Sequence, residues 1–166
     1  GTTDFTVQEV VDRSGQSLRS FYLQFDGKHE LLLALFEDAL NRAADQIRAA
    51  ADPESDPLNR LKISIALLFE LCRPDPAARQ PLFTDFAPRL VVTHPDEVKI
   101  AQAPLLSLLT ELMENASAAG ELRPSANPAR MAAMAMQTVM FIAQSSGTTD
   151  SAAADSITTD ELWDFL

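Results

Sequence analysis

The chain has 166 residues, of which 46% are hydrophobic and 22% are charged, a composition that suits one globular core or a small module joined to a larger one. Its single cysteine, Cys72, excludes an intrachain disulfide, and no apolar run is long enough to span a membrane. The net charge of −11 is divided into −2 over residues 1–30 and −9 over the remainder, so neither part is basic. With no signal-peptide pattern at the start, we expect a cytoplasmic protein that makes no membrane contact.

Helix-start signals recur along the chain. Thr6-Val-Gln-Glu9 has the form of a capping box, in which a Thr hydroxyl and a Glu carboxylate satisfy free amides, and Thr158-Thr-Asp-Glu161 repeats it. Further starts are marked by a capping or acidic residue beside a proline, at Asp56-Pro57, Asp75-Pro76, His94-Pro95-Asp96-Glu97 and Asn127-Pro128. These signals predict an all-helical protein.

Apolar residues at helical spacing lie between these starts. They predict helices at about 6–13, 17–23, 27–50, 57–73, 76–91, 95–119 and 128–145, and a last helix from about 159. Residues 51–57 and 145–156 are expected to be loops, because they are rich in Pro, Asp, Ser and Thr. No alternating strand pattern of useful length occurs. The predicted fold class is all-α.

The first two predicted helices are short and are joined by a turn at Gly15, which is suited to a sharp change of direction. Val7, Val10 and Val11 form an apolar face on the first helix, against which Phe21 and Phe25 of the second can pack, together with Leu18. Two short helices around a glycine turn form a helix-turn-helix layout, in which the start of the second helix enters the DNA major groove.

The segment TVQEVVDRSGQSLRSFYLQFDGKHEL, residues 6–31, resembles the DNA-binding head of the TetR family of bacterial transcriptional regulators. The family pattern is approximately T-hydrophobic-x-x-I-A-x-x-A-G-V-S-x-x-T-L-Y-x-H-F-x-S-K-E-x-L. The positions that match it are Thr6, Val7, Val10, Gly15, Ser17, Tyr22, Phe25, Lys28, Glu30 and Leu31. The positions that depart from it are Val11, Gln16, Ser20 and Phe21.

The resemblance implies two parts. Residues 1–30 would be the helix-turn-helix head, and residues 31–166 the ligand-sensing and dimerising body. The family has a further helix before this motif, so we expect upstream residues to supply it, with Gly1 to Phe5 as its end and connection.

The resemblance also assigns DNA contacts. The expected set is Thr6, Gln16, Ser17, Arg19, Ser20, Tyr22 and Lys28. Arg19 is the expected base reader, since a guanidinium can hold guanine O6 and N7 together, whereas Tyr22, Lys28 and Thr6 match phosphate-binding positions. Each of these residues also has a purely structural alternative, which stays open. Arg19 could pair with a nearby carboxylate (Glu9 or Asp12), and Tyr22 could be a core aromatic. Lys28 could be a solvated charge, and Thr6 and Ser17 could serve only as helix caps.

In the family the body encloses an effector. The expected lining is apolar and adaptable: Leu68, Phe69, Cys72, Phe83, Phe86, Leu90, Leu108, Leu112, Met113, Met136, Met140 and Phe141. Arg73, His94, Gln102 and Gln137 are possible polar anchors, so a mainly apolar small molecule is expected. Ordinary core packing is the alternative for each apolar residue. For Cys72 three roles are possible: a small buried thiol, a redox sensor or a ligand contact.

The last two helices would form a homodimer interface by the same resemblance. Its expected members are Met131, Met134, Ala135, Thr138, Ile142, Leu162, Trp163 and Phe165, followed by Leu166. Trp163 is the single tryptophan, and tryptophans are enriched among interface hot spots. A buried role within one subunit is the alternative for Trp163.

The sequence therefore predicts a ligand-responsive transcriptional repressor that binds palindromic operator DNA as a dimer. The alternative is a helical ligand-binding or interaction protein that does not bind DNA. An enzyme is not expected, because the chain shows no evident nucleophile beside His29 or His94, no Gly-rich phosphate loop and no Cys/His metal spacing. No cofactor and no metal ion are expected.

Overall fold

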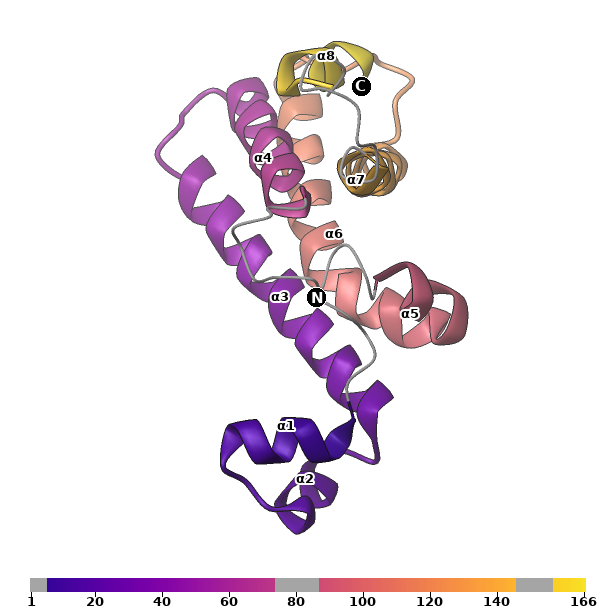
Figure 1. The fold of residues 1–166 in the computed structure, drawn as a ribbon. Coiled ribbons are helices and arrows are strands. Elements are labelled where there is room, and N and C mark those ends of the chain that lie inside the picture. The colour runs from indigo at the N-terminus through magenta and orange to yellow at the C-terminus, as the bar shows by residue number, and fades with distance from the viewer. Residues whose placement is uncertain (1–5, 74–86, 146–156) are drawn as a thin grey trace.

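The computed structural model describes residues 6–73, 87–145 and 157–166, with only the backbone described at 87–89, 144 and 145. Within these ranges the chain forms eight α-helices and no strand (Figure 1). Their bounds are α1 Val7–Ser14, α2 Leu18–Gln24, α3 Lys28–Ala51, α4 Pro57–Cys72, α5 Ala87–Thr93, α6 Pro95–Ala118, α7 Pro128–Ser145 and α8 Thr159–Phe165. The predicted all-α class is confirmed.

Most of the predicted helix-start residues form capping hydrogen bonds in the structure. Thr6 and Thr158 each close a complete capping box, and the Asp56 carboxylate accepts the Asn59 amide at 2.8 Å. The Asn127 side-chain oxygen accepts the Arg130 amide at 3.0 Å at the start of α7. His94 precedes α6 but makes no capping bond with its side chain, and Asp96 and Glu97 occupy the first turn instead. The Asp75 signal and residues 76–86 of the helix expected at 76–91 lie outside the described residues, whereas its last part corresponds to α5.

Helix α3 is the long element that joins the two ends of the molecule (Figure 1). Its start follows the α1–α2 pair, and its remaining length packs against α4 and α6. Leu32, Phe36, Leu40 and Ile47 lie on one face of α3 at helical spacing and are buried. The proposed division between a head and a body after residue 30 therefore falls inside a continuous helix.

The core of the body lies between α3, α4, α6 and α7. The pairs α3 and α6, α6 and α7, α3 and α4, and α4 and α7 are the main helix contacts, while α5 packs on α6 and α8 on α4. The completely buried large side chains include Phe36 from α3, Phe69 from α4, Leu109 from α6 and Val139 from α7. In the described ranges, no helix has both the length and the apolar character needed to cross a bilayer.

Candidate nucleic-acid interface

Helix α1 begins at a tightly bonded cap. The Thr6 hydroxyl accepts the Glu9 amide at 3.2 Å, and the Thr6 amide donates to a Glu9 carboxylate oxygen at 2.7 Å. The backbone and then the side-chain hydrogen bond from Thr6 lower the pKa of Glu9, with smaller contributions from the charges of Arg13 and Lys28. Thr6 is thus a helix cap, whatever it also contacts outside the molecule.

The turn between α1 and α2 depends on Gly15. Its φ of 67° and ψ of 17° lie in the left-handed region, which side chains with a Cβ adopt at a cost. An added Cβ would meet nothing within 4 Å, so backbone conformation and not space favours glycine here. The Gly15 amide donates to the Val11 carbonyl and ends α1, which lets the chain reverse into α2.

Helix α2 presents an exposed N-terminal turn. Ser17 caps it by accepting the Ser20 amide at 3.1 Å, and the two serine hydroxyls lie 3.0 Å apart. Gln16 and Arg19 are exposed, and Ser20 is half-buried. None of the ion pairs found among the described residues joins Arg19 to Glu9 or Asp12. Asp12 instead accepts a hydrogen bond from Gln8 at 2.7 Å. Among the described residues of the head, no carboxylate therefore forms an ion pair with the guanidinium of Arg19.

Phe21 lies on the buried side of α2, away from the exposed Arg19. It is 7% exposed, and its ring lies 5.4 Å from Phe25 and 5.3 Å, edge to face, from Tyr22. Tyr22 itself is 56% exposed, so it is not a core aromatic. Lys28 is half-buried in the first turn of α3 and close enough to Glu9 to act on its pKa. The structure thus places Thr6 and Lys28 at one end of the α1–α2 pair.

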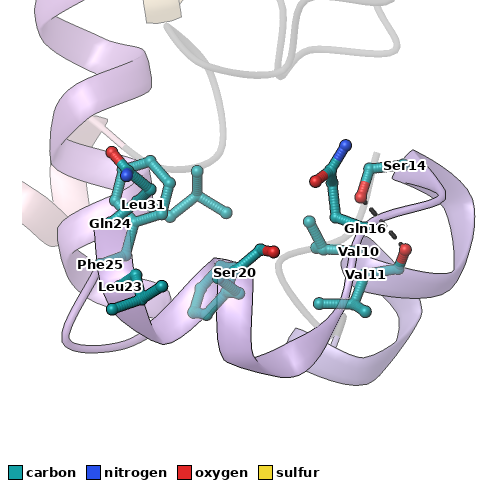
Figure 2. A pocket seen from close by; sticks show the side chains of 10 residues that line it. Val10, Val11, Ser14, Gln16, Ser20, Leu23, Gln24, Phe25 and Leu31 are labelled. Carbon is teal, nitrogen blue, oxygen red and sulfur yellow. Dashed lines mark hydrogen bonds between the residues drawn. The ribbon is translucent and has the colours of Figure 1, made fainter.

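An apolar groove that sequence reasoning missed runs between α1, α2 and the start of α3. It has a volume of about 470 Å³ (Figure 2). Val10 and Val11 line one side in Figure 2, and Phe25 and Leu31 line the other. Its other lining residues are Ser14, Gln16, Ser20, Phe21, Leu23 and Gln24. Two residues predicted to contact DNA, Gln16 and Ser20, therefore also border the groove.

In the body, nine of the predicted effector-lining residues belong to one buried cluster: Leu68, Phe69, Cys72, Leu90, Leu108, Leu112, Met113, Met136 and Met140. Phe83 and Phe86 lie outside the described residues. The prediction for Phe141 is wrong, because its side chain is 71% exposed. It lies seven residues after Met134, which is 70% exposed, so both occupy the outward face of α7.

The four expected polar anchors separate. Gln102 is buried, and Gln137 on α7 donates to its side-chain oxygen at 3.5 Å, so this pair bridges α6 and α7. Arg73 is exposed at the end of α4, where it lies 5.7 Å from the Phe69 ring and pairs with Glu70 at 3.4 Å. His94 lies at the start of α6 beside His29 and not in the core cluster. In the described residues no group of three or more His, Cys, Asp or Glu side chains is placed to hold a metal ion.

The residues expected at the dimer interface also separate by burial. Ala135 and Leu162 are 2% and 1% exposed and belong to the core, so their assignment to an intersubunit surface is wrong. Met134 and Phe165 are 70% and 74% exposed. Met131, Thr138, Ile142 and Trp163 are half-buried. The most exposed apolar members of this set are therefore Met134 on α7 and Phe165 at the end of α8.

Cys72 should resist alkylation in the folded protein. It is completely buried in the core, and burial raises the pKa of its thiol to about 12. Because only the thiolate reacts, we expect almost no labelling by iodoacetamide at pH 8 and full labelling once urea unfolds the chain. Rapid labelling without unfolding would show that Cys72 is open to solvent and would restore the redox-sensor alternative.

The molecule is thus an all-α protein in which a helix-turn-helix stands at one end of a long helix and a helical body surrounds the other.

No family model and no curated protein matches the chain. Several solved structures are similar, among them two regulators. The fatty acid degradation regulator FadR from Bacillus halodurans has 20% identity and a TM-score of 0.67, and the match covers 86% of this chain and 73% of that one. A transcriptional regulator of the TetR/AcrR family from Thermobifida fusca YX-ER1 has 15% identity and a TM-score of 0.58, over 97% and 82% of the two chains. The chain therefore has the fold of TetR-type regulators.

Proposed function

We propose that the chain is a transcriptional repressor that binds palindromic operator DNA as a homodimer and releases it when a small, mainly apolar effector binds. The observation that carries the proposal is the first turn of α2, which is capped by Ser17 and presents an exposed Arg19 with no ion-pair partner among the described residues. The two similar solved structures named above are described as regulators, which supports the same conclusion.

The proposed DNA contacts divide into two kinds. Gln16, Ser17, Arg19 and Ser20, at the start of α2, face base edges in the major groove, and Arg19 holds a guanine in a bidentate way. Tyr22, Lys28 and Thr6 contact phosphates, which set the orientation of the head without reading sequence. The Ser17–Ser20 hydroxyl contact at 3.0 Å fixes this turn before DNA arrives and so reduces the ordering cost of binding.

Dimerisation supplies the specificity that one short helix lacks. Two heads related by a two-fold axis read the two halves of a palindrome, with half-site centres about 34–36 Å apart or a multiple of that distance. We assign the interface to the outward face of α7, where Met134 and Phe141 are the most exposed apolar residues, together with Trp163 and Phe165 of α8. Phe141 replaces Ala135 and Leu162 in the set assigned from the sequence.

The effector is proposed to bind within the core between α4, α6 and α7. Met113, Met136 and Met140 can rearrange their flexible side chains around an apolar molecule, and the Gln102–Gln137 pair offers one polar contact. The similar FadR is described as a regulator of fatty acid degradation, which makes aliphatic acids a sensible first set to screen. An effector raises the melting temperature of the protein by mass action, and failure of every apolar compound to do so would count against this site.

The proposed mechanism is a shift between two arrangements of the heads. Effector binding favours a spacing that no longer fits successive major grooves, and α3 carries the change because it runs from the core to the head. A coupling free energy of about 1–3 kcal/mol would be ordinary for such a regulator.

Selection from a random DNA library tests the DNA-binding part directly. The intact protein should enrich a palindrome, and adding an effector found by thermal shift should release it. If no sequence is enriched although a compound raises the melting temperature, the alternative function holds, namely a helical ligand-binding protein that does not bind DNA.

A further inference from the structure

The only two histidines of the chain lie against each other, although 64 residues separate them in the sequence. His29 is in the first turn of α3, and His94 is the residue directly before α6. Their ring centroids are 5.4 Å apart with an interplanar angle of 71°, an edge-to-face contact. The hydroxyl of Thr93 lies 2.8 Å from Nδ1 of His94 and orients that ring.

This contact lies where the head meets the body. Helices α1 and α2 make their main contact with each other, and α3 makes its main contacts with α4 and α6 (Figure 1). His29 is four residues after Phe25, the C-cap of α2, and so it belongs to the head end of α3. The histidine pair therefore links the first turn of α3 to the start of α6.

The charges around the pair are mostly acidic. Asp26, Lys28, Glu30 and Glu97 line the same open hollow of about 570 Å³ as the two histidines. The Glu30 carboxylate accepts a hydrogen bond from the backbone amide of Asp26. On α6 the Asp96 carboxylate lies 3.4 Å from Nζ of Lys99. A second proton on the imidazole pair places two cations in contact, and like charges at this distance repel.

We propose that His29 and His94 form a pH-sensitive joint between α3 and α6, closed while at most one imidazole is protonated and opened when both are. Histidine is the side chain that ordinarily changes charge between about pH 5 and 8, so a pH series across that range tests the joint. Opening releases the head end of α3 from the start of α6. Any resulting change in operator affinity rests on the proposed function, whereas the joint itself does not.

Nuclear magnetic resonance of the two imidazoles tests the joint without DNA. Two histidines give two ring signals, and His29→Gln and His94→Gln assign them. Ring carbon shifts report the protonation of each imidazole, and the nuclear Overhauser effect between the rings reports their contact. We expect this inter-ring effect at pH 8 and its loss at the pH where both rings carry a proton, while Trp163 fluorescence shows that the body stays folded.

Persistence of the inter-ring effect with both rings protonated would overturn the proposal, as would its absence at pH 8. A further test uses exchange of the Leu31 amide, which donates to the Gly27 carbonyl at the start of α3, corrected for the intrinsic effect of pH. Protection should fall on acidification in the wild type and change little in His94→Gln, which removes one charge and keeps a polar side chain. An equal fall in both proteins would assign the effect to the neighbouring carboxylates and overturn the joint.

Discussion

Phe69→Ala should lower the free energy of unfolding by about 3–5 kcal/mol, the usual cost of removing a buried phenylalanine side chain. Phe69 is completely buried on α4 and belongs to the core cluster of the body, so the change leaves a cavity in that core. Urea unfolding followed by circular dichroism, at one fixed protein concentration, measures the loss.

Ile100→Ala is the matched control for this experiment. Ile100 lies on α6 and is 69% exposed, so its truncation should change the free energy of unfolding by no more than about 0.5 kcal/mol. A similar loss in both variants would mean that the packing of α4, α6 and α7 is not as described.

The double variant Met134→Glu, Phe141→Glu should convert the proposed dimer into a monomer. The Met134 and Phe141 side chains are 70% and 71% exposed on the outward face of α7. Each substitution would therefore bury an unpaired carboxylate in the proposed apolar interface. Size-exclusion chromatography with light scattering should give half the wild-type mass, with unchanged helical content.

Ile100→Glu controls for adding an exposed acid to a helix of the body, and it should remain a dimer. If the α7 variant also keeps the dimer mass, the interface lies elsewhere. A wild-type protein that is monomeric at micromolar concentration would contradict the dimer itself.

Local signals in the sequence predict where four of the helices begin. Thr6 and Thr158 form capping boxes, and Asp56 and Asn127 bond to amides three residues ahead, so the starts of α1, α4, α7 and α8 follow from neighbouring residues alone. Gly15 likewise marks the turn, because its left-handed conformation is a local requirement. These features need no knowledge of tertiary packing.

The inward face of α7 was not predictable in the same way. Residues 131–143 are apolar apart from Gln137 and Thr138, so hydrophobic periodicity does not distinguish the core side from the outer side. The pattern therefore places Ala135 at an interface and Phe141 in the effector lining, whereas the structure buries Ala135 and exposes Phe141. Leu162 was misplaced for a related reason, since α8 is too short for a clear period.

Contacts between distant residues were also missed. In the sequence neither His29 nor His94 has a neighbouring residue that predicts their contact. Nothing local indicates that α3 and α6 begin side by side. The groove beside Val10 and Leu31 likewise exists only once α1, α2 and α3 are assembled. The DNA-contact assignments for Arg19, Tyr22 and Lys28 came from the family pattern and remain predictions.

The acidic net charge of −11 makes salt dependence an informative test, because phosphate contacts must come from a few local cations such as Lys28. The most direct measurement is fluorescence anisotropy of the selected palindrome with the intact protein at several salt concentrations. Arg42→Ala is the matched control, since Arg42 is an exposed arginine on α3 whose partner is Asp38 at 2.7 Å.

We expect wild type and Arg42→Ala to bind with equal, salt-sensitive affinity. Arg19→Ala should lose about 1–3 kcal/mol of discrimination, the range for one bidentate arginine–guanine contact, and should no longer distinguish the base at one position of each half-site. Absence of salt-sensitive binding to any palindrome, or an Arg19→Ala protein that matches wild type at every base position, would contradict the assignment of α2 as the DNA-reading helix.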